Sequence, residues 1–431
     1  MSDANLDALR RGDLAGAREL RLTGLGLREF PPEILGLADT LEVLDLGGNA
    51  LTDLPAGIAC LRRLKILFLS GNPMRRLPPA LGGLPALSQL GARGCGTEEV
   101  PGEALPPALR WLTLTGNAIA TMPEELGKRP ALQKLMLAGN HLSALPEALA
   151  GAANLELIRL SANRLEALPP WLAALPRLAW IAWAGNPLDP LAPGLDAADI
   201  PWSALEPAEI LGQGASGLVR RATWRAGEGP RPVALKLFKG AMTSDGLPER
   251  EMEACLRAGA HPNLPGALGR LKDHPEGLHG LVMPLLPETW RPLAGPPSPD
   301  SCSRDAYDPA LRLLPDAALR LARATAAAAA HLHARGLLHG DLYAHNTLWD
   351  GEKGEAVLSD FGAASRLPPG AAGIPWQRVE VRAWGILLGE ILDRCPPLSA
   401  DPALRALARR CTAPDPAARA LMQDALHALG D

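Results

Sequence analysis

Glycines and a lysine in the second half of the chain have the types and the order of a phosphate-binding site. Gly212, Gly214 and Gly217 lie in one short run, and without a Cβ they would let the backbone approach a phosphate group closely. Lys236 follows within an apolar run, and its ammonium would neutralise phosphate oxygens. A glycine motif alone is weak evidence, because dinucleotide-binding folds use it too. Lysine is scarce in this arginine-rich chain, which favours a specific role for Lys236.

Oxygen ligands follow further along the chain. Asp341, Asn346 and Asp360 offer carboxylate and amide oxygens, which a hard cation such as Mg²⁺ prefers. The first two belong to the run His-Gly-Asp-Leu-Tyr-Ala-His-Asn, and the third opens the run Asp-Phe-Gly. Together with the glycine run and the Val-Ala-Leu-Lys segment that ends at Lys236, this order of motifs resembles the protein kinases. The resemblance covers residues 208–428 and implies a bilobal α+β kinase-like domain that uses ATP and Mg²⁺.

The resemblance also implies a role for each of these residues. Lys236 would hold the α- and β-phosphates of ATP and would itself be held by a glutamate on the next helix. Glu251 is the favoured partner, Glu253 is the second candidate, and Glu249 lies close by. Asp341 would orient the attacking hydroxyl and accept its proton, while the amide and the carboxylate downstream would hold Mg²⁺.

A site for adenine is implied in the same way. The residues expected to enclose the ring are Val219, Ala234 and Leu348. The segment 281–286 is similar to the hinge between the two lobes of a kinase and ends at Leu286. Pro284 is acceptable in a hinge at the position that offers its backbone carbonyl and not an N–H.

The catalytic loop departs from the kinase pattern at three positions. Gly340 replaces the usual arginine, so activation through a loop phosphate that pairs with that arginine is not expected. Tyr343 stands where serine/threonine kinases carry a lysine aimed at the γ-phosphate. His345 occupies the place of a tyrosine-kinase arginine, and we hypothesise that its protonated form substitutes in part. The alternative is a histidine that is packed or hydrogen-bonded beneath the loop.

The activation segment is also shortened. No Ala-Pro-Glu triplet lies between Gly362 and the run 381–385, which resembles the start of the core helix of the large lobe. Glu380 takes the place of an aspartate that contacts the catalytic-loop backbone, and Arg419 needs a partner other than the missing glutamate. Residues 287–307, rich in proline, serine and arginine, are interpreted as an ordered surface loop or a lid.

The first half of the chain is a repeat array. The pattern Leu-x-x-Leu-x-Leu-x-x-Asn-x-Leu begins at Leu41 and returns about every 23 residues, with a divergent copy before it at Ala17. This resembles the leucine-rich repeat, which implies a curved α/β solenoid built from stacked copies. The asparagines would satisfy backbone groups at each turn. The segment around Leu6 and Leu9 is interpreted as a helical cap over the first copy.

Outward-facing strand positions of the solenoid are unusually apolar. The apolar strip that they are expected to form on the concave face consists of Ile66, Phe68, Trp111, Met136, Leu157 and Trp180. We hypothesise that this strip docks a partner protein or the second half of the chain. The alternative is a set of scattered apolar side chains of the kind that any surface carries.

Composition bounds the remaining possibilities. The chain has 431 residues, 47% of them hydrophobic, which is enough for two or three domains with cores of their own. A net charge of −4 indicates neither a nucleic-acid nor a membrane partner. The six cysteines lack metal-site or redox spacing, and we expect free thiols in a reducing cytoplasm. No stretch resembles an export signal or a membrane span.

The sequence therefore predicts a leucine-rich-repeat domain over 1–191, a linker over 192–207 and a kinase-like domain over 208–431. The small lobe would end near residue 283 and the large lobe would begin near residue 287. This organisation resembles the bacterial leucine-rich-repeat protein kinases, which implies a cytoplasmic enzyme that phosphorylates Ser or Thr, itself included. Two alternatives stay open: a pseudokinase scaffold that binds a protein partner, and a phosphotransferase acting on a small molecule.

Overall fold

The computed structural model describes residues 2–190, 197–214, 216–227, 229–240, 242–243 and 245–430. The chain divides into two compact units, described separately below. The first comprises Met1–Leu175 with Asn186–Leu188, and the second comprises Pro176–Gly185 with Asp189–Asp431. The beginning of the predicted linker, residues 192–196, and the last residue of the predicted repeat domain lie outside the described residues.

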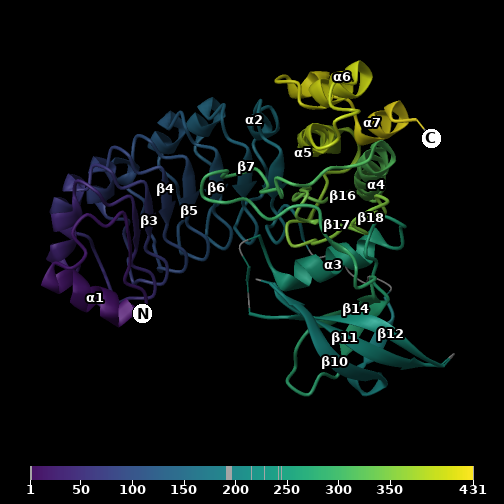
Figure 1. Cartoon of the computed structure of the whole chain (residues 1–431), viewed down its shortest axis with the longest axis horizontal. Helices are drawn as coiled ribbons and strands as arrows, with labels where there is room; N and C mark the ends of the chain where they lie inside the picture. The colour runs from purple at the N-terminus through teal and green to yellow at the C-terminus, as the bar shows by residue number, and fades with distance from the viewer. Residues whose placement is uncertain are drawn as a thin grey trace. The chain divides into compact units, whose positions relative to one another are not determined.

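Short parallel strands and short helices alternate through the repeats, as the leucine pattern predicts (Figure 1). Each strand has a buried leucine or isoleucine at its centre, because its flanking residues point to the opposite face. The strands, in sheet order, are β1 (Glu19–Arg21), β2 (Val43–Asp45), β3 (Ile66–Phe68), β4 (Gln89–Gly91), β5 (Trp111–Thr113), β6 (Lys134–Met136), β7 (Leu157–Arg159) and β8 (Trp180–Ala182).

A short helical turn that follows a proline closes each repeat. A helix at the N-terminus, α1 (Ser2–Arg11), covers the first copy with Leu9 buried, as the expected cap would. The turns that follow are η1 (Pro32–Leu37), η2 (Ala56–Cys60), η3 (Pro79–Gly83), η4 (Gly102–Ala104), η5 (Glu124–Lys128), η6 (Glu147–Gly151) and α2 (Pro170–Ala173).

A ladder of asparagines fixes the turn of each repeat. The Asn117 amide donates to the carbonyls of Ala92 and Leu114 at 2.9 and 2.8 Å, and its Oδ1 accepts from the N–H groups of Cys95 and Thr97. Buried backbone groups would otherwise lack partners at these turns. The asparagines of the neighbouring copies bond in the same way, which confirms the role predicted for them.

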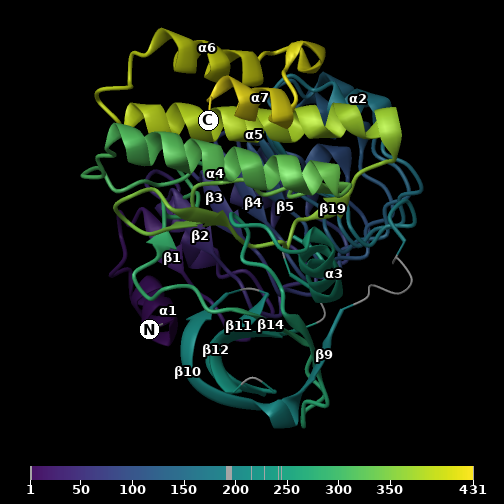
Figure 2. The same ribbon diagram turned by 90° about the vertical axis from the view of Figure 1, so that its right-hand side faces the viewer.

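A curled sheet and one helix form the small lobe of the second unit (Figure 2). The sheet order is β10-β11-β12-β14-β13-β9. The elements are β9 (Asp199–Pro201), η7 (Trp202–Ala204), β10 (Leu205–Gln213), β11 (Gly217–Ala226), β12 (Gly229–Phe238), α3 (Pro248–Ala258), β13 (Gly269–Lys272) and β14 (Gly280–Pro284). The described part of the predicted linker is therefore not free chain, since β9 pairs in parallel with β13 at the edge of the sheet.

The large lobe is mainly helical. Alanines on α4 allow α5 to pack closely, and the Trp384 Nε1 donates across to Ala322 O and Thr325 Oγ1, both at 3.2 Å. The elements are β15 (Arg291–Pro292), α4 (Pro315–Ala334), β16 (Leu337–Leu338), β17 (Thr347–Trp349), β18 (Ala356–Leu358), β19 (Ser365–Arg366), η8 (Gly370–Gly373), α5 (Ile374–Asp393), α6 (Pro402–Cys411), η9 (Pro416–Ala418) and α7 (Met422–Ala428).

Two features of the second unit differ from expectation. Helix α5 begins at Ile374, seven residues before the run taken for its start, because Pro375 sits in its first turn, where a missing N–H is tolerated. Pro176–Gly185, which the repeat pattern assigns to the solenoid, belongs to the compact unit that contains the lobes. Strand β8 of the last repeat is thus part of that unit.

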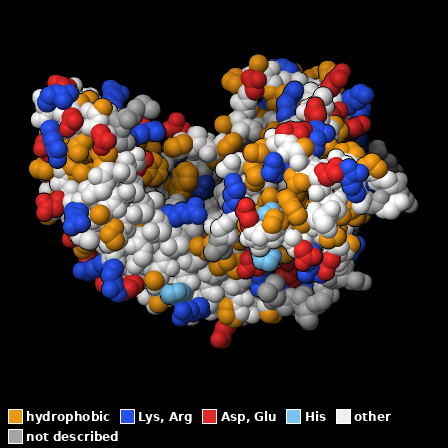
Figure 3. All heavy atoms as spheres, turned by 90° about the horizontal axis from the view of Figure 1, so that it is seen from below, with side chains coloured by type: hydrophobic (Ala, Val, Ile, Leu, Met, Phe, Trp, Pro, Cys, Tyr) orange, Lys and Arg blue, Asp and Glu red, His pale blue; other side chains and the backbone are white. Residues whose placement is uncertain are grey.

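The surface drawn in Figure 3 carries acidic and basic side chains interspersed, as the small net charge leads one to expect. The cysteines are free thiols, as expected from their spacing. Among the described residues, none of the helices combines the length and the apolar character needed to cross a bilayer.

Candidate active site

A cavity of about 420 Å³ opens between the small and the large lobe of the second unit. Its lining is mostly apolar and includes a few charged groups, as is usual for small-molecule sites. The residues from the sequence analysis that line it are Val219, Ala234, Lys236, Glu251, Pro284, Leu286, Leu348 and Asp360. Strands β11, β12, β14 and β17 and helix α3 supply six of these residues. The other two, Leu286 and Asp360, follow β14 and β18.

Lys236 on β12 forms an ion pair with Glu251 on α3. Both side chains are largely buried, at 13% and 3% exposed. Burial disfavours the ammonium, but the carboxylates of Glu251 and Asp360 outweigh it and raise the pKa of Lys236. Glu253, the second candidate, points elsewhere and pairs with Arg250 and Arg257. Glu251, the favoured candidate among the three glutamates, is therefore the one that contacts Lys236.

The catalytic loop holds Asp341 through Asn346. The Asn346 amide nitrogen donates to the Asp341 backbone carbonyl at 2.9 Å and to its Oδ2 at 2.8 Å. The Asp341 backbone N–H donates to Nδ1 of His339 at 3.3 Å, which fixes the other side of the loop. The carboxylate orientation is thus set by the loop itself.

Asp360 lines the cavity and has the backbone conformation of a turn. Its φ of +63° is in the left-handed region, which aspartate tolerates better than most residues. Oδ1 accepts from the Gly362 N–H at 3.0 Å, while Phe361 packs its ring 5.3 Å from that of His339. The carboxylate is exposed, so it is accessible to a ligand in the cavity.

The donor set here fits a hard cation. Asp360 offers carboxylate oxygens, and Asn346 offers its amide oxygen because its amide nitrogen is engaged by Asp341; Mg²⁺ prefers oxygen ligands of this kind. Among the described residues there is no cluster of three or more His, Cys, Asp or Glu side chains that could hold a metal by themselves. A cation at this place would therefore complete its coordination with water and phosphate oxygens, as Mg²⁺ commonly does.

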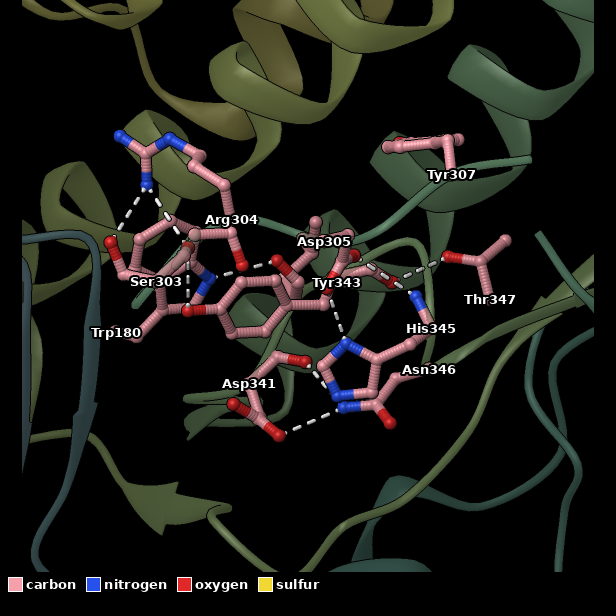
Figure 4. A network of polar contacts seen from close by, with 12 residues as sticks. Trp180, Ser303, Arg304, Asp305, Tyr307, Asp341, Tyr343, His345, Asn346 and Thr347 are labelled. Carbon is pink, nitrogen blue, oxygen red and sulfur yellow. Dashed lines mark hydrogen bonds and ion pairs between the residues drawn. The ribbon is translucent and has the colours of Figure 1, made fainter. Parts of the chain in front are cut away.

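His345 is held by an aspartate from the segment that precedes α4. Its Nδ1 lies 2.7 Å from Asp305 Oδ1, and its backbone N–H donates to Asp305 Oδ2 at 3.1 Å (Figure 4). Burial lowers the basicity of the ring, but Asp305 and Asp341 outweigh it and raise the pKa of His345. The structure supports both interpretations of this histidine. It is hydrogen-bonded beneath the loop, and the neighbouring carboxylates favour its protonated form.

Tyr343 packs against the last repeat. Its ring stacks on Trp180 of β8 at 4.2 Å with an interplanar angle of 6°, and the Trp180 Nε1 donates to Leu342 O at 3.0 Å (Figure 4). Both aromatic side chains are almost fully buried. The position of the usual lysine is thus filled by an aromatic contact that fixes the catalytic loop.

Two family descriptions match the sequence. "Leucine rich repeat" matches residues 107–165, and "Protein tyrosine and serine/threonine kinase" matches residues 205–371. The chain carries a leucine-rich-repeat region followed by a protein kinase domain.

Individual relatives are similar to parts of the chain. A probable myosin light chain kinase of Dictyostelium discoideum is 32% identical over 153 residues, which is 35% of this chain and 44% of the relative. Mouse leucine-rich repeat serine/threonine-protein kinase 1 is 41% identical over 76 residues, 17% of this chain and 4% of that protein. Mouse vasorin is 35% identical over 123 residues, covering 27% and 18%. The chain spans less than half the length of each of these relatives.

The glycine loop of the kinase domain has two kinds of glycine. A Cβ on Gly217 would lie 2.2 Å from the carbonyl oxygen of Leu237, so this glycine is needed for the close approach of β11 to β12. A Cβ on Gly212 or Gly214 would meet nothing within 4 Å. The latter two lie over open space and do not line the described cavity, which leaves their backbone accessible.

The shortened activation segment has replacements for the contacts it lacks. Glu380 on α5 accepts from the Gly340 N–H at 2.7 Å, so the expected contact with the catalytic-loop backbone is confirmed. The guanidinium of Arg419 donates to the carbonyls of Ala413, Arg378 and Pro176 instead of to a glutamate. Burial lowers the pKa of Arg419 to about 10.

Sequence reasoning missed two contributors to the site. Asp305 falls in the segment interpreted as a surface loop or lid, yet its side chain is fully buried against His345. Leu211 precedes the glycine run and lines the cavity although 43% of it is exposed. An isolated acidic residue in a proline- and serine-rich stretch gives no periodic pattern, whereas Leu211 could have been found from its place beside the glycines.

Proposed function

We propose that this chain is an ATP- and Mg²⁺-dependent protein kinase that transfers the γ-phosphate to Ser or Thr hydroxyls, its own included. The observation that carries the proposal is the ion pair between Lys236 and Glu251 at one end of the cavity, with Asp360 close enough to affect the lysine electrostatically. Such a pair positions a lysine for the α- and β-phosphates. Val219, Ala234 and Leu348 are the proposed walls for adenine, with Pro284 and Leu286 at the hinge.

The chain's own residues would then act as follows. Asp341, fixed by the Asn346 amide, orients the acceptor hydroxyl and takes its proton. Asn346 and Asp360 would hold Mg²⁺, which would neutralise phosphate charge when bound with ATP. His345, hydrogen-bonded to Asp305, adds positive charge beside Asp341 in its protonated form.

The test is transfer of label from γ-labelled ATP with Mg²⁺ to the intact chain and to a generic protein substrate. Lys236→Met, Asp341→Asn and Asp360→Asn should each lower the rate by about a hundredfold or more. Lys239→Met is the matched control, because this lysine lies three residues further on and is exposed. Equal transfer by the intact chain and by all three site variants would contradict the proposal.

One observation favours a second candidate, a pseudokinase scaffold that binds a partner without catalysis. Tyr343 replaces the lysine that would reach the γ-phosphate, and its stacking on Trp180 keeps the ring in place. Binding of a nucleotide without transfer of label, in the intact chain and in Asp341→Asn alike, would favour the scaffold.

We further propose that the outward face of the repeat strands recruits the protein substrate or a regulator. Ile66, Phe68 and Trp111 are half-buried, and Gly91 leaves room for the Phe68 ring, since a Cβ there would lie 2.9 Å from it. Met136 and Leu157 are buried. The double variant Phe68→Ala with Trp111→Ala should weaken phosphorylation of a natural substrate and leave autophosphorylation unchanged. Full-strength substrate phosphorylation in this variant would contradict the recruiting role.

A further inference from the structure

A single buried residue after the last repeat contacts two elements of the active site. Asp189 is 2% exposed. Its Oδ1 accepts from the Arg366 Nε at 2.5 Å, and its Oδ2 accepts from the Arg366 backbone N–H at 3.4 Å. Its backbone carbonyl accepts from the Arg250 Nη2 at 2.9 Å. The next carbonyl, that of Pro190, accepts from the Arg366 guanidinium as well.

The two arginines belong to elements next to residues of the proposed active site. Arg250 on α3 is the neighbour of Glu251, which pairs with the active-site lysine. Arg366 lies in β19, four residues after the Asp-Phe-Gly motif ends at Gly362. Asp189 therefore contacts both the helix that carries Glu251 and the segment that follows Asp360.

Strand β8 packs against Gly340, the position at which kinases regulated by a loop phosphate carry an arginine. A Cβ on Gly340 would lie 2.5 Å from the carbonyl oxygen of Ile181 and 2.6 Å from that of Ala363. Gly340 also has a φ of +76°, which disfavours any residue with a side chain. An arginine is excluded at this position by the strand packed against it.

The activation segment also lacks an accessible hydroxyl that could be phosphorylated. Ser365 is the hydroxyl-bearing residue between Gly362 and Val381. It is 2% exposed, and its Oγ accepts from the Trp183 N–H at 2.9 Å and lies 3.3 Å from the Ala363 carbonyl oxygen. A phosphate on this oxygen would have to displace the last repeat.

We propose that Asp189 is a positioning residue that takes the place of an activation-loop phosphate, so that the kinase site stays assembled without phosphorylation. The inference rests on the proposed kinase function. A carboxylate fixed by the fold supplies the anion that pairs with an arginine of the activation segment. The backbone carbonyl of the same residue accepts from Arg250 of α3, the helix that carries Glu251, the partner of Lys236.

The test compares kcat and KM for ATP in the full chain after treatment with a protein phosphatase. Asp189→Asn keeps the size of the side chain and removes its charge, and we expect kcat to fall about ten- to a hundredfold with KM for ATP changed by less than about twofold. Asp393→Asn is the control, because Asp393 also bonds an arginine, at 2.6 Å, but on the far end of α5. Phosphatase treatment itself should leave the unmodified chain fully active.

A second variant removes the other side of the contact. Arg366→Gln should lower kcat to a similar extent, and combining it with Asp189→Asn should add little, because both variants break one interaction. Unchanged kcat in Asp189→Asn, a rise in kcat, or loss of activity after phosphatase treatment of the unmodified chain would each overturn the proposal. A rise in kcat would indicate that Asp189 inhibits the kinase site.

Hydrogen exchange separates this proposal from the proposed function. If the unmodified chain transfers no phosphate, the kinase proposal fails, and the backbone amides around Arg366 then decide on Asp189. They should exchange about tenfold faster in Asp189→Asn than in Asp393→Asn, because this segment loses the charged partner of Arg366. Equal exchange in the two variants would overturn the positioning role.

Discussion

The last repeat and the repeats before it share one sequence pattern and differ in what their outward residues contact. In β2 the residues on either side of the buried Leu44 are half-buried. In β8 all three residues are buried, as they are in β4 and β7. What sets the last repeat apart is that Trp180 and the following Trp183 contact groups of the kinase lobe: the Leu342 carbonyl, the Ser365 hydroxyl and the Arg366 carbonyl. Trp180 stands at an outward strand position and Trp183 at a leucine position of the repeat pattern, so both kinds of position take part in this contact.

This difference shows how a solenoid can become part of an enzyme without losing its period. The inward positions of β8 keep the repeat, with Ile181 fully buried like its counterparts. Positions 180 and 183 carry tryptophan, whose large ring and N–H donor suit a contact that is partly apolar and partly hydrogen-bonded. The catalytic loop has adapted in turn, since Gly340 makes room for β8 and Tyr343 supplies the ring beneath Trp180.

The largest effect should come from removing the contact ring of the last repeat. Trp180→Ala empties a fully buried site and should lower the free energy of unfolding of the second unit by about 3–5 kcal/mol. Trp111→Ala, at the equivalent strand position of β5, removes a half-buried ring that carries Lys134 at 4.0 Å and should cost less than about 1 kcal/mol. Urea unfolding of the two variants measures the difference.

Trp180→Phe separates stacking from hydrogen bonding at the same site. It keeps an aromatic face for Tyr343 and loses the N–H that donates to Leu342, so it should recover most of the lost stability. Equal destabilisation by Trp180→Ala and Trp111→Ala would show that the last repeat is held no differently from the others.

A smaller effect is expected from glycines that share one backbone conformation in the two regions. Gly340→Ala would introduce a Cβ against two carbonyl oxygens and should destabilise the second unit by about 2–4 kcal/mol. Gly94→Ala in the repeats has a similar φ of +62° but meets nothing within 4 Å, and it should cost about 1–2 kcal/mol. Calorimetry of the two variants checks the order, and a larger cost at Gly94 would refute the close packing of β8 on the catalytic loop.

Periodic features were predictable from the sequence. The leucine spacing located the strands centred on Leu44 and Leu67, and the asparagine slots gave the hydrogen bonds of the turns. In the kinase half, motif order led to Lys236 and to its partner Glu251 among three nearby glutamates. These predictions work because each relies on residues a few positions apart or on motifs in a known order.

Contacts between distant residues were not predictable. Nothing in the sequence links Asp189 with Arg366, 177 positions away, or Asp305 with His345, because single acidic residues follow no period. The start of α5 was misplaced since the run 381–385 lies in the middle of the helix, after Pro375 in its first turn. Strand β8 belongs to the second unit because Trp180 packs against the catalytic loop, and the repeat pattern does not predict that contact.

The smallest effect concerns two glutamates, one in each region, whose pKa values are both lowered. In the repeats, a hydrogen bond from Lys65 is the main cause of the lowered pKa of the half-buried Glu42. In the kinase domain, Glu380 is 1% exposed; burial favours its neutral form, but His333 and the Gly340 N–H outweigh this and lower its pKa. Glu380→Gln should cost about 1–3 kcal/mol at pH 7, because a buried charged hydrogen bond is lost.

The pH dependence gives the sign of this last prediction. An acid whose pKa is lower in the folded state contributes stability above its ordinary pKa of 4.5, and that contribution disappears as the pH falls through the lowered value. Urea midpoints of the unmodified chain and of Glu380→Gln should therefore differ at pH 7 and pH 5 and converge below pH 4.5. Glu42→Gln should show a smaller difference that salt reduces, because its ion pairs face water. A gap for Glu380→Gln that stays constant down to acid pH would mean that its carboxylate anchors the catalytic loop by shape and not by charge.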